Sequence, residues 1–244
     1  MDGYVRNSTE FEAALSDLLV QSQYYYDNEN LSINFVNTKI YTSQIDEVQK
    51  FVEALEPEKA PYKVGDRTIS KLNEILKMVL DSTNQNNISI LVSDCIYSLD
   101  KKNDTEGALE LEKSLTKGAF LEKSKQFGFT TIVLKMKSKC TGNYWNKDNS
   151  SVYLNGASRP YYIWIIGSKE HINEFSKNIK IQSLKGFEHS YFLSNFTKVK
   201  QPYYSVLKET NRLGRFKQAD RNEKEVKSIN DVEFDGGNLQ LQLT

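Results

Sequence analysis

The feature that most restricts how this chain can fold is an apolar run that ends in an acidic residue. Residues 88–92 read Ile-Ser-Ile-Leu-Val, a composition typical of a strand covered on both faces of a sheet. The run stops at Ser93-Asp94-Cys95. Open α/β sheets bind ligands beyond the carboxyl ends of their strands, so Asp94 is the first candidate site residue. The alternative is that Asp94 caps the following turn or helix, as Asp commonly does.

Helical and extended patterns alternate along the first 180 residues. Their periods predict helices over 8–26, 43–55, 68–80, 106–127 and 168–179, a hairpin over 31–42, and strands over 88–92, 129–136 and 161–167. Strands that alternate with helices favour parallel crossovers in one open sheet. We therefore expect a three-layer α/β fold, with a mostly parallel, Rossmann-like sheet flanked by helices.

Two segments lack a clear period. Residues 137–159 are expected to be irregular, and their aromatic residues either line a ligand surface or plug a hairpin. After Lys180 the aromatic residues follow no period, residues 208–228 are dense in charge, and residues 239–243 alternate cleanly. We expect an α/β domain over residues 1–180, and a linker with the start of a β-rich extension over 181–244.

The composition excludes several classes of partner. Lys+Arg and Asp+Glu both total 32, so no global field favours nucleic acid. The most apolar window, 161–167, is far shorter than the roughly 20 residues that span a bilayer. The first residues carry no secretory signal, and two cysteines indicate no disulfide framework. A cytoplasmic location is the default expectation, although a signal could lie upstream of Met1.

Two loops carry a resemblance to a known family. Gly65-Asp66-Arg67-Thr68 precedes a long helix, and Ser93-Asp94 ends the following apolar strand. This order and spacing resembles the von Willebrand factor A-like family. Its metal-ion-dependent adhesion site takes a Thr from the loop before one helix and an Asp from a strand end written Ser-Asp-Gly. The resemblance covers about residues 1–179, and Cys95 stands where the family has Gly.

The resemblance implies a metal site. Thr68 and Asp94 would be direct or water-bridged ligands of Mg²⁺ or Mn²⁺, Asp2 would add a ligand, and Ser93 and Asp66 would orient them. Such ions prefer near-octahedral oxygen ligands and keep several waters. Thr68 and Asp94 alone would hold the ion only weakly.

The resemblance also implies that a strand precedes Met1. The family carries Asp-x-Ser-x-Ser at the end of its first strand, just before its first helix, and Met1-Asp2-Gly3 resembles what commonly follows that motif. We therefore expect this chain to be an N-terminally truncated version of a longer domain. Without the central strand, two sheet edges would be left unpaired.

Three functions follow as hypotheses. The first is a non-enzymatic interaction module that binds an acidic group of another protein through the divalent ion. The second is a metal-free scaffold of the same fold, and the third is a metal-dependent hydrolase. No catalytic residue is assigned, because His171 is expected to be exposed, His189 is expected to be a surface or packing residue, and no glycine cradle or nucleophile elbow is present.

Overall fold

The computed structural model describes residues 2–6, 8–26, 31–43, 45, 47–55, 71–96, 105–146, 150–194, 215–218 and 229–233. The chain divides into two compact units, Met1–Asn195 and Phe196–Thr244. In the second unit, β7 (Arg215–Gln218) pairs antiparallel with β8 (Ile229–Glu233). All other elements belong to the first unit, in which η3 and β6 lie beyond the expected domain boundary at Lys180.

The helices of the first unit are α1 (Glu10–Tyr26), α2 (Val48–Glu53), α3 (Leu72–Ser82), α4 (Thr105–Gln126) and α5 (Lys169–Asn178), with short 3₁₀ helices η1 (Asp2–Tyr4) and η3 (Ile181–Ser183). Its strands are β1 (Asn34–Val36), β2 (Ile40–Thr42), β3 (Ile88–Ser93), β4 (Phe129–Trp145), β5 (Ser151–Ser168) and β6 (Phe187–Ser194). The helices and the β1–β2 hairpin form where the sequence periods predicted them, although α2 is shorter than expected.

The strand directions correct the predicted sheet. The main sheet has the order β3-β5-β4-β6, and each neighbouring pair is antiparallel. The expected parallel, Rossmann-like sheet is therefore wrong. Residues 137–159, expected to be irregular, mostly extend β4 and β5 into one long hairpin, with a register shift between Cys140 and Gly142. A parallel crossover needs a dozen or more connecting residues, usually a helix, and none separates these two strands.

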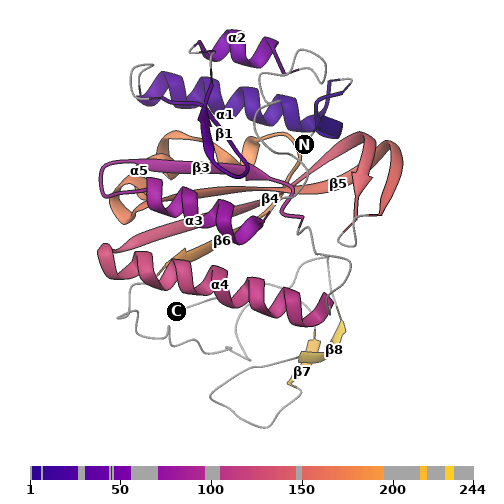
Figure 1. The fold of residues 1–244 in the computed structure, drawn as a ribbon. Helices are drawn as coiled ribbons and strands as arrows, with labels where there is room; N and C mark the ends of the chain where they lie inside the picture. Colours follow the sequence, from indigo (N-terminus) through magenta and orange to yellow (C-terminus); the bar gives the residue numbers. More distant parts are fainter. Residues whose placement is uncertain are drawn as a thin grey trace. The chain divides into compact units, whose positions relative to one another are not determined.

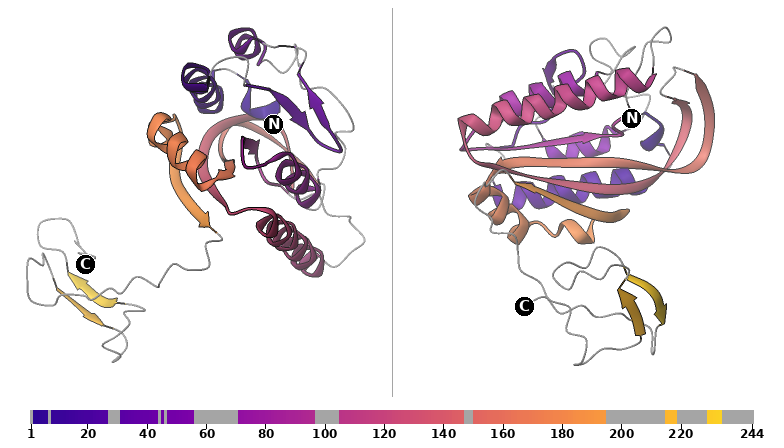
Figure 2. Two further views of the ribbon diagram at one scale, coloured as in Figure 1. Left: turned by 90° about the vertical axis from the view of Figure 1, so that its left-hand side faces the viewer. Right: turned by 90° about the horizontal axis from the view of Figure 1, so that it is seen from below.

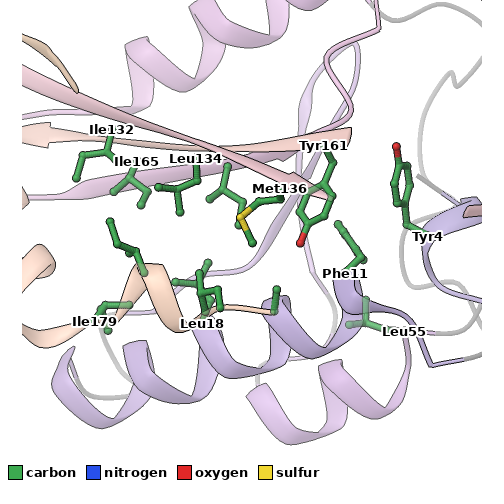
Figure 3. Close-up of a cluster of buried hydrophobic side chains, with 14 of the residues drawn as sticks. Tyr4, Phe11, Leu18, Leu55, Ile132, Leu134, Met136, Tyr161, Ile165 and Ile179 are labelled. Carbon is green, nitrogen blue, oxygen red and sulfur yellow. The ribbon is translucent and has the colours of Figure 1, made fainter. Parts of the chain in front are cut away.

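Helices cover both faces of this sheet (Figures 1 and 2). One face carries alternate residues of β4 and β5, among them Leu134 and Ile163, and forms a core with α1, α2 and α5. The opposite face carries Phe129 and Ile166 and forms a second core with α3 and α4. Figure 3 shows the first core, in which β4 and β5 residues meet α1 and the Tyr4 segment.

The start of α1 is anchored to the long hairpin. Thr9 and Glu12 form a capping box, because the Thr9 N–H donates to the Glu12 carboxylate at 2.7 Å and the Glu12 N–H donates to Thr9 Oγ1 at 3.3 Å. The Phe11 N–H donates to Ser138 Oγ at 3.0 Å, and Glu10 accepts from the Lys139 N–H at 2.9 Å. These bonds fix α1 against one end of β4, where the candidate site lies.

Candidate functional site

The turn after β3 presents Asp94. Ser93 Oγ accepts the Cys95 N–H at 3.0 Å, and Asp94 Oδ1 accepts the Ile96 N–H at 3.4 Å. Cys95 has a φ of 54°, a left-handed conformation that favours glycine. Asp94 is half-buried and forms no ion pair with any described residue. The Asp94 carboxylate therefore caps a local turn, as the capping alternative predicts. Its remaining lone pairs can accept further hydrogen bonds.

The N-terminal segment packs at the same end of the sheet. Tyr4 is buried, and its hydroxyl donates to the Pro160 carbonyl at 2.8 Å. A Cβ added to Gly3 would lie 2.5 Å from Cys140 Sγ, so η1 sits directly against β4. Burial raises the pKa of Tyr4, with further upward contributions from Asp94, Cys140 and Tyr144 and an opposing one from Arg159. We call these five residues, Tyr4, Asp94, Cys140, Tyr144 and Arg159, the Asp94 end.

Arg159 is the cation of the Asp94 end. It pairs with Ser138 across the hairpin and shares a strand face with Tyr161 and the first core. Its guanidinium carbon lies 3.9 Å from the centre of the Tyr144 ring. Its Nε is buried and has no hydrogen-bond partner among the described residues. A buried donor left unsatisfied costs about 1–3 kcal/mol, so this atom needs an explanation.

The remaining polar groups of this region do not suggest nucleophilic chemistry. Burial raises the thiol pKa of Cys140 and likewise of Cys95, which keeps both thiols protonated and unreactive. Burial also raises the pKa of Tyr161, whose ring packs beside Tyr4 and Phe11 (Figure 3). Of the two histidines, His171 lies 3.0 Å from Ser168 Oγ at the start of α5, and His189 is exposed on β6.

The structure brings together only part of the predicted metal site. Ser93 and Asp94 lie at the end of β3, and Asp2 begins η1 at the same end of the sheet. Thr68, Asp66 and the side chain of Asp2 lie outside the described residues. Among the described residues, no group of three or more His, Cys, Asp or Glu side chains is placed to hold a metal. The described side chains around Asp94 are a guanidinium and phenols, and these add none of the carboxylate ligands that Mg²⁺ or Mn²⁺ prefers.

Sequence reasoning missed Tyr4 and Arg159. An arginine within a polar stretch resembles a solvent-exposed residue, and only the extension of β5 back to Ser151 places Arg159 in the same row as Tyr161 and Ile163. The available signal was the alternation from Arg159 through Ile165 along β5. For Tyr4, no period in the first residues indicated burial.

The comparisons with known proteins do not assign the chain to a family. A scan against family models, a search of curated proteins and a search of solved structures all return no match. The von Willebrand factor A-like resemblance therefore stays a prediction based on its motif residues. No helix within the described part of the chain is long and apolar enough to cross a membrane.

Proposed function

We propose that this chain is a non-enzymatic protein-interaction module, and that it binds an extended apolar segment of a partner protein along the edge of β6 that no other described strand pairs with. The observation that carries this proposal is the exposure of three successive large side chains at that edge. Tyr191 is 51%, Phe192 62% and Leu193 49% exposed. An edge strand offers unpaired backbone groups that another strand can use.

The chemistry of β6 indicates the kind of segment it would bind. Its first half is charged, and Glu188 bonds to Lys135 Nζ at 2.9 Å. Residues 190–194 carry no charge and no proline, although proteins commonly protect exposed edges with both. Opposite β4, Tyr191 faces Val133 and Leu193 faces Thr131, so these two side chains lie on one sheet face and Phe192 lies on the other. A partner strand with apolar residues on both faces would match them.

A photo-crosslinking amino acid at position 192, with a second at position 121 as the control, tests where a partner binds. Leu121 on α4 is 55% exposed, so it matches the exposure of the β6 residues without being part of a sheet edge. We expect a partner to be crosslinked from position 192 only. We also expect the purified partner to protect the amides of residues 190–193 from hydrogen exchange.

Matched charge substitutions complete this test. Leu193→Lys should abolish binding of the purified partner, and Leu121→Lys should leave it unchanged. Equal losses in the two variants, or protection confined to other elements, would contradict the β6 proposal. Turnover of any member of a phosphoester and peptide panel would contradict the non-enzymatic assignment.

Metal-mediated capture of a partner's acidic group, with Asp94, Thr68 and Asp2 as ligands and Ser93 and Asp66 in support, is the second candidate. Two observations support it: Cys95 adopts a glycine-like conformation where the von Willebrand factor A-like family has Gly, and η1 reaches the same end of the sheet. Thermal unfolding with and without Mg²⁺ or Mn²⁺ tests it. A midpoint that rises with the ion in the natural protein, but not in Asp94→Asn, would favour the metal. An unchanged midpoint would favour the metal-free module.

A further inference from the structure

Arg159 is a cation without a counter-ion among the described residues. Arg159 lies on the same face of β5 as Tyr161 and Ile163, whose side chains are each 1% exposed. None of the described carboxylates lies within ion-pair distance of its guanidinium, and its buried Nε has no partner. A guanidinium held in this way is normally paired, because a partly buried charge without a partner is costly.

The guanidinium also lies over an aromatic ring. Tyr144 from the far part of β4 stacks against it with 3.9 Å between the guanidinium carbon and the ring centre. The Tyr144 ring covers a face of the guanidinium plane, and because Nε is buried, the two Nη groups are the edge donors open to a ligand. An arginine oriented beforehand loses less rotamer entropy when it binds a ligand. The arrangement therefore has the properties of a preformed anion site.

The shape of the guanidinium favours a carboxylate as the anion. Arg6 is exposed, and its Nε lies 4.0 Å from the position that a Cβ on Gly142 would occupy. Asp94 raises the pKa of Tyr4 and of Cys140, whereas Arg159 lowers both, and the N-terminal amino group also lowers that of Cys140. The net charge of this region therefore does not select the anion. A planar carboxylate matches the guanidinium fork and carries one charge, whereas phosphate carries close to two at neutral pH.

We infer that Arg159, oriented by Tyr144, is the anion-binding residue of a carboxylate site at the Asp94 end, and that this site binds a glutamate or aspartate side chain of a partner directly, without a metal ion. The von Willebrand factor A-like resemblance also implies that a partner's acidic group binds at this end of the sheet, but through a metal ion. The positive charge that binds it comes from the chain itself. This site is separate from the β6 edge, and either can exist without the other.

Nuclear magnetic resonance of the arginine Nε–H groups in the full chain tests the inference. The probes are a capped Ala-Glu-Ala peptide, the capped Ala-Gln-Ala peptide, acetate and inorganic phosphate, all without divalent ions. We expect the glutamyl peptide to shift the Arg159 Nε–H resonance saturably, with acetate weaker and the glutaminyl peptide without effect. No saturable shift with the glutamyl peptide overturns the site. If acetate binds as tightly as the peptide, the assignment of a partner side chain as the ligand is overturned. If phosphate binds more tightly than the peptide, the assignment of a carboxylate is overturned.

Four variants identify the residues responsible, with the backbone amide of residue 144 as the signal. Arg159→Gln should abolish the shift, and Arg159→Lys should weaken binding about tenfold because lysine lacks the planar fork. Arg6→Gln is the matched control and should bind within twofold of the natural chain. An equal loss of binding in Arg6→Gln would show that binding depends only on the general positive charge of this region. It would overturn the specific role of Arg159. Tyr144→Leu, which leaves the buried row intact, should weaken binding if the stacking orients the guanidinium, and unchanged binding overturns that role.

Discussion

The two edge strands of the main sheet, β3 and β6, differ in how their side chains are used. Leu91 of β3 is 4% exposed in the second core, and Ile88 and Val92 pack against the first core. In β6, Phe187 packs against the first core, but Tyr191, Phe192 and Leu193 are about half exposed or more. Both strands end the sheet, yet only β3 contributes side chains to both cores. The position of a strand at the edge of a sheet therefore does not determine whether its side chains stabilise the fold or are exposed for binding.

The largest expected difference comes from matched leucine truncations. Leu91→Ala should lower the free energy of unfolding by about 2–5 kcal/mol, because it removes a buried side chain and leaves a cavity. Leu193→Ala should change it by no more than about 0.5 kcal/mol, because that side chain is half exposed. Denaturant unfolding of the two variants measures both values. Similar losses would show that the outer half of β6 is part of the folding core.

A smaller effect is expected where the chain turns into β6. Gly186 has a φ of 82°, and a Cβ there would clash with the Lys137 carbonyl oxygen, while its own carbonyl accepts the Lys137 N–H at 2.8 Å. Gly186→Ala should therefore cost about 1–3 kcal/mol through backbone strain. The loss should appear first as faster hydrogen exchange in β6, with β3 unchanged.

Gly118 provides the matched control for this substitution. It lies within α4, and a Cβ there would meet nothing within 4 Å. Gly118→Ala should stabilise the protein by about 0.5–1 kcal/mol, since alanine is the better helix former. A loss of stability in both variants would show that the β6 result does not depend on the left-handed conformation of Gly186.

The sequence predicted the helices and strands more accurately than it predicted the relative directions of the strands. The stripes of α1, α3 and α5 and the apolar run of β3 follow simple periods, which depend on local geometry alone. The direction of β5 depends on residues 137–159, which were interpreted as irregular. Lys135, Lys137 and Lys139 alternate there with the buried Met136, Ser138 and Cys140. This alternation was the available signal for a long hairpin and for an antiparallel sheet.

The candidate site was predictable only where it depends on the end of one strand. Asp94 follows an apolar run, so its place beyond β3 could be inferred from the sequence. Arg159 and Tyr144 meet because the long hairpin pairs in a particular register with a shift after Cys140. Register is set by long-range pairing rather than by local composition. The guanidinium that changes the chemistry of this end therefore emerged only from the structure.

The smallest expected effect concerns the ion pair that attaches β6 to β4. The hydrogen bond from Lys135 is the largest cause of the lowered pKa of Glu188, and the same bond raises the pKa of Lys135. Because the folded pKa of Glu188 is depressed, its contribution to stability is present above the unfolded pKa of about 4.3. It is lost as the pH falls through the folded pKa.

Glu188→Gln should therefore make the exchange of β6 amides less dependent on pH across this acidic window. Amides of β3, which has no such ion pair among the described residues, should be unaffected by the substitution. The pair is exposed, so the effect should be small and should shrink further in high salt. Hydrogen exchange of both strands at neutral and acidic pH measures it. Equal responses in β3 and β6 would show that acid loosens the whole sheet, and that β6 is not the more weakly attached edge.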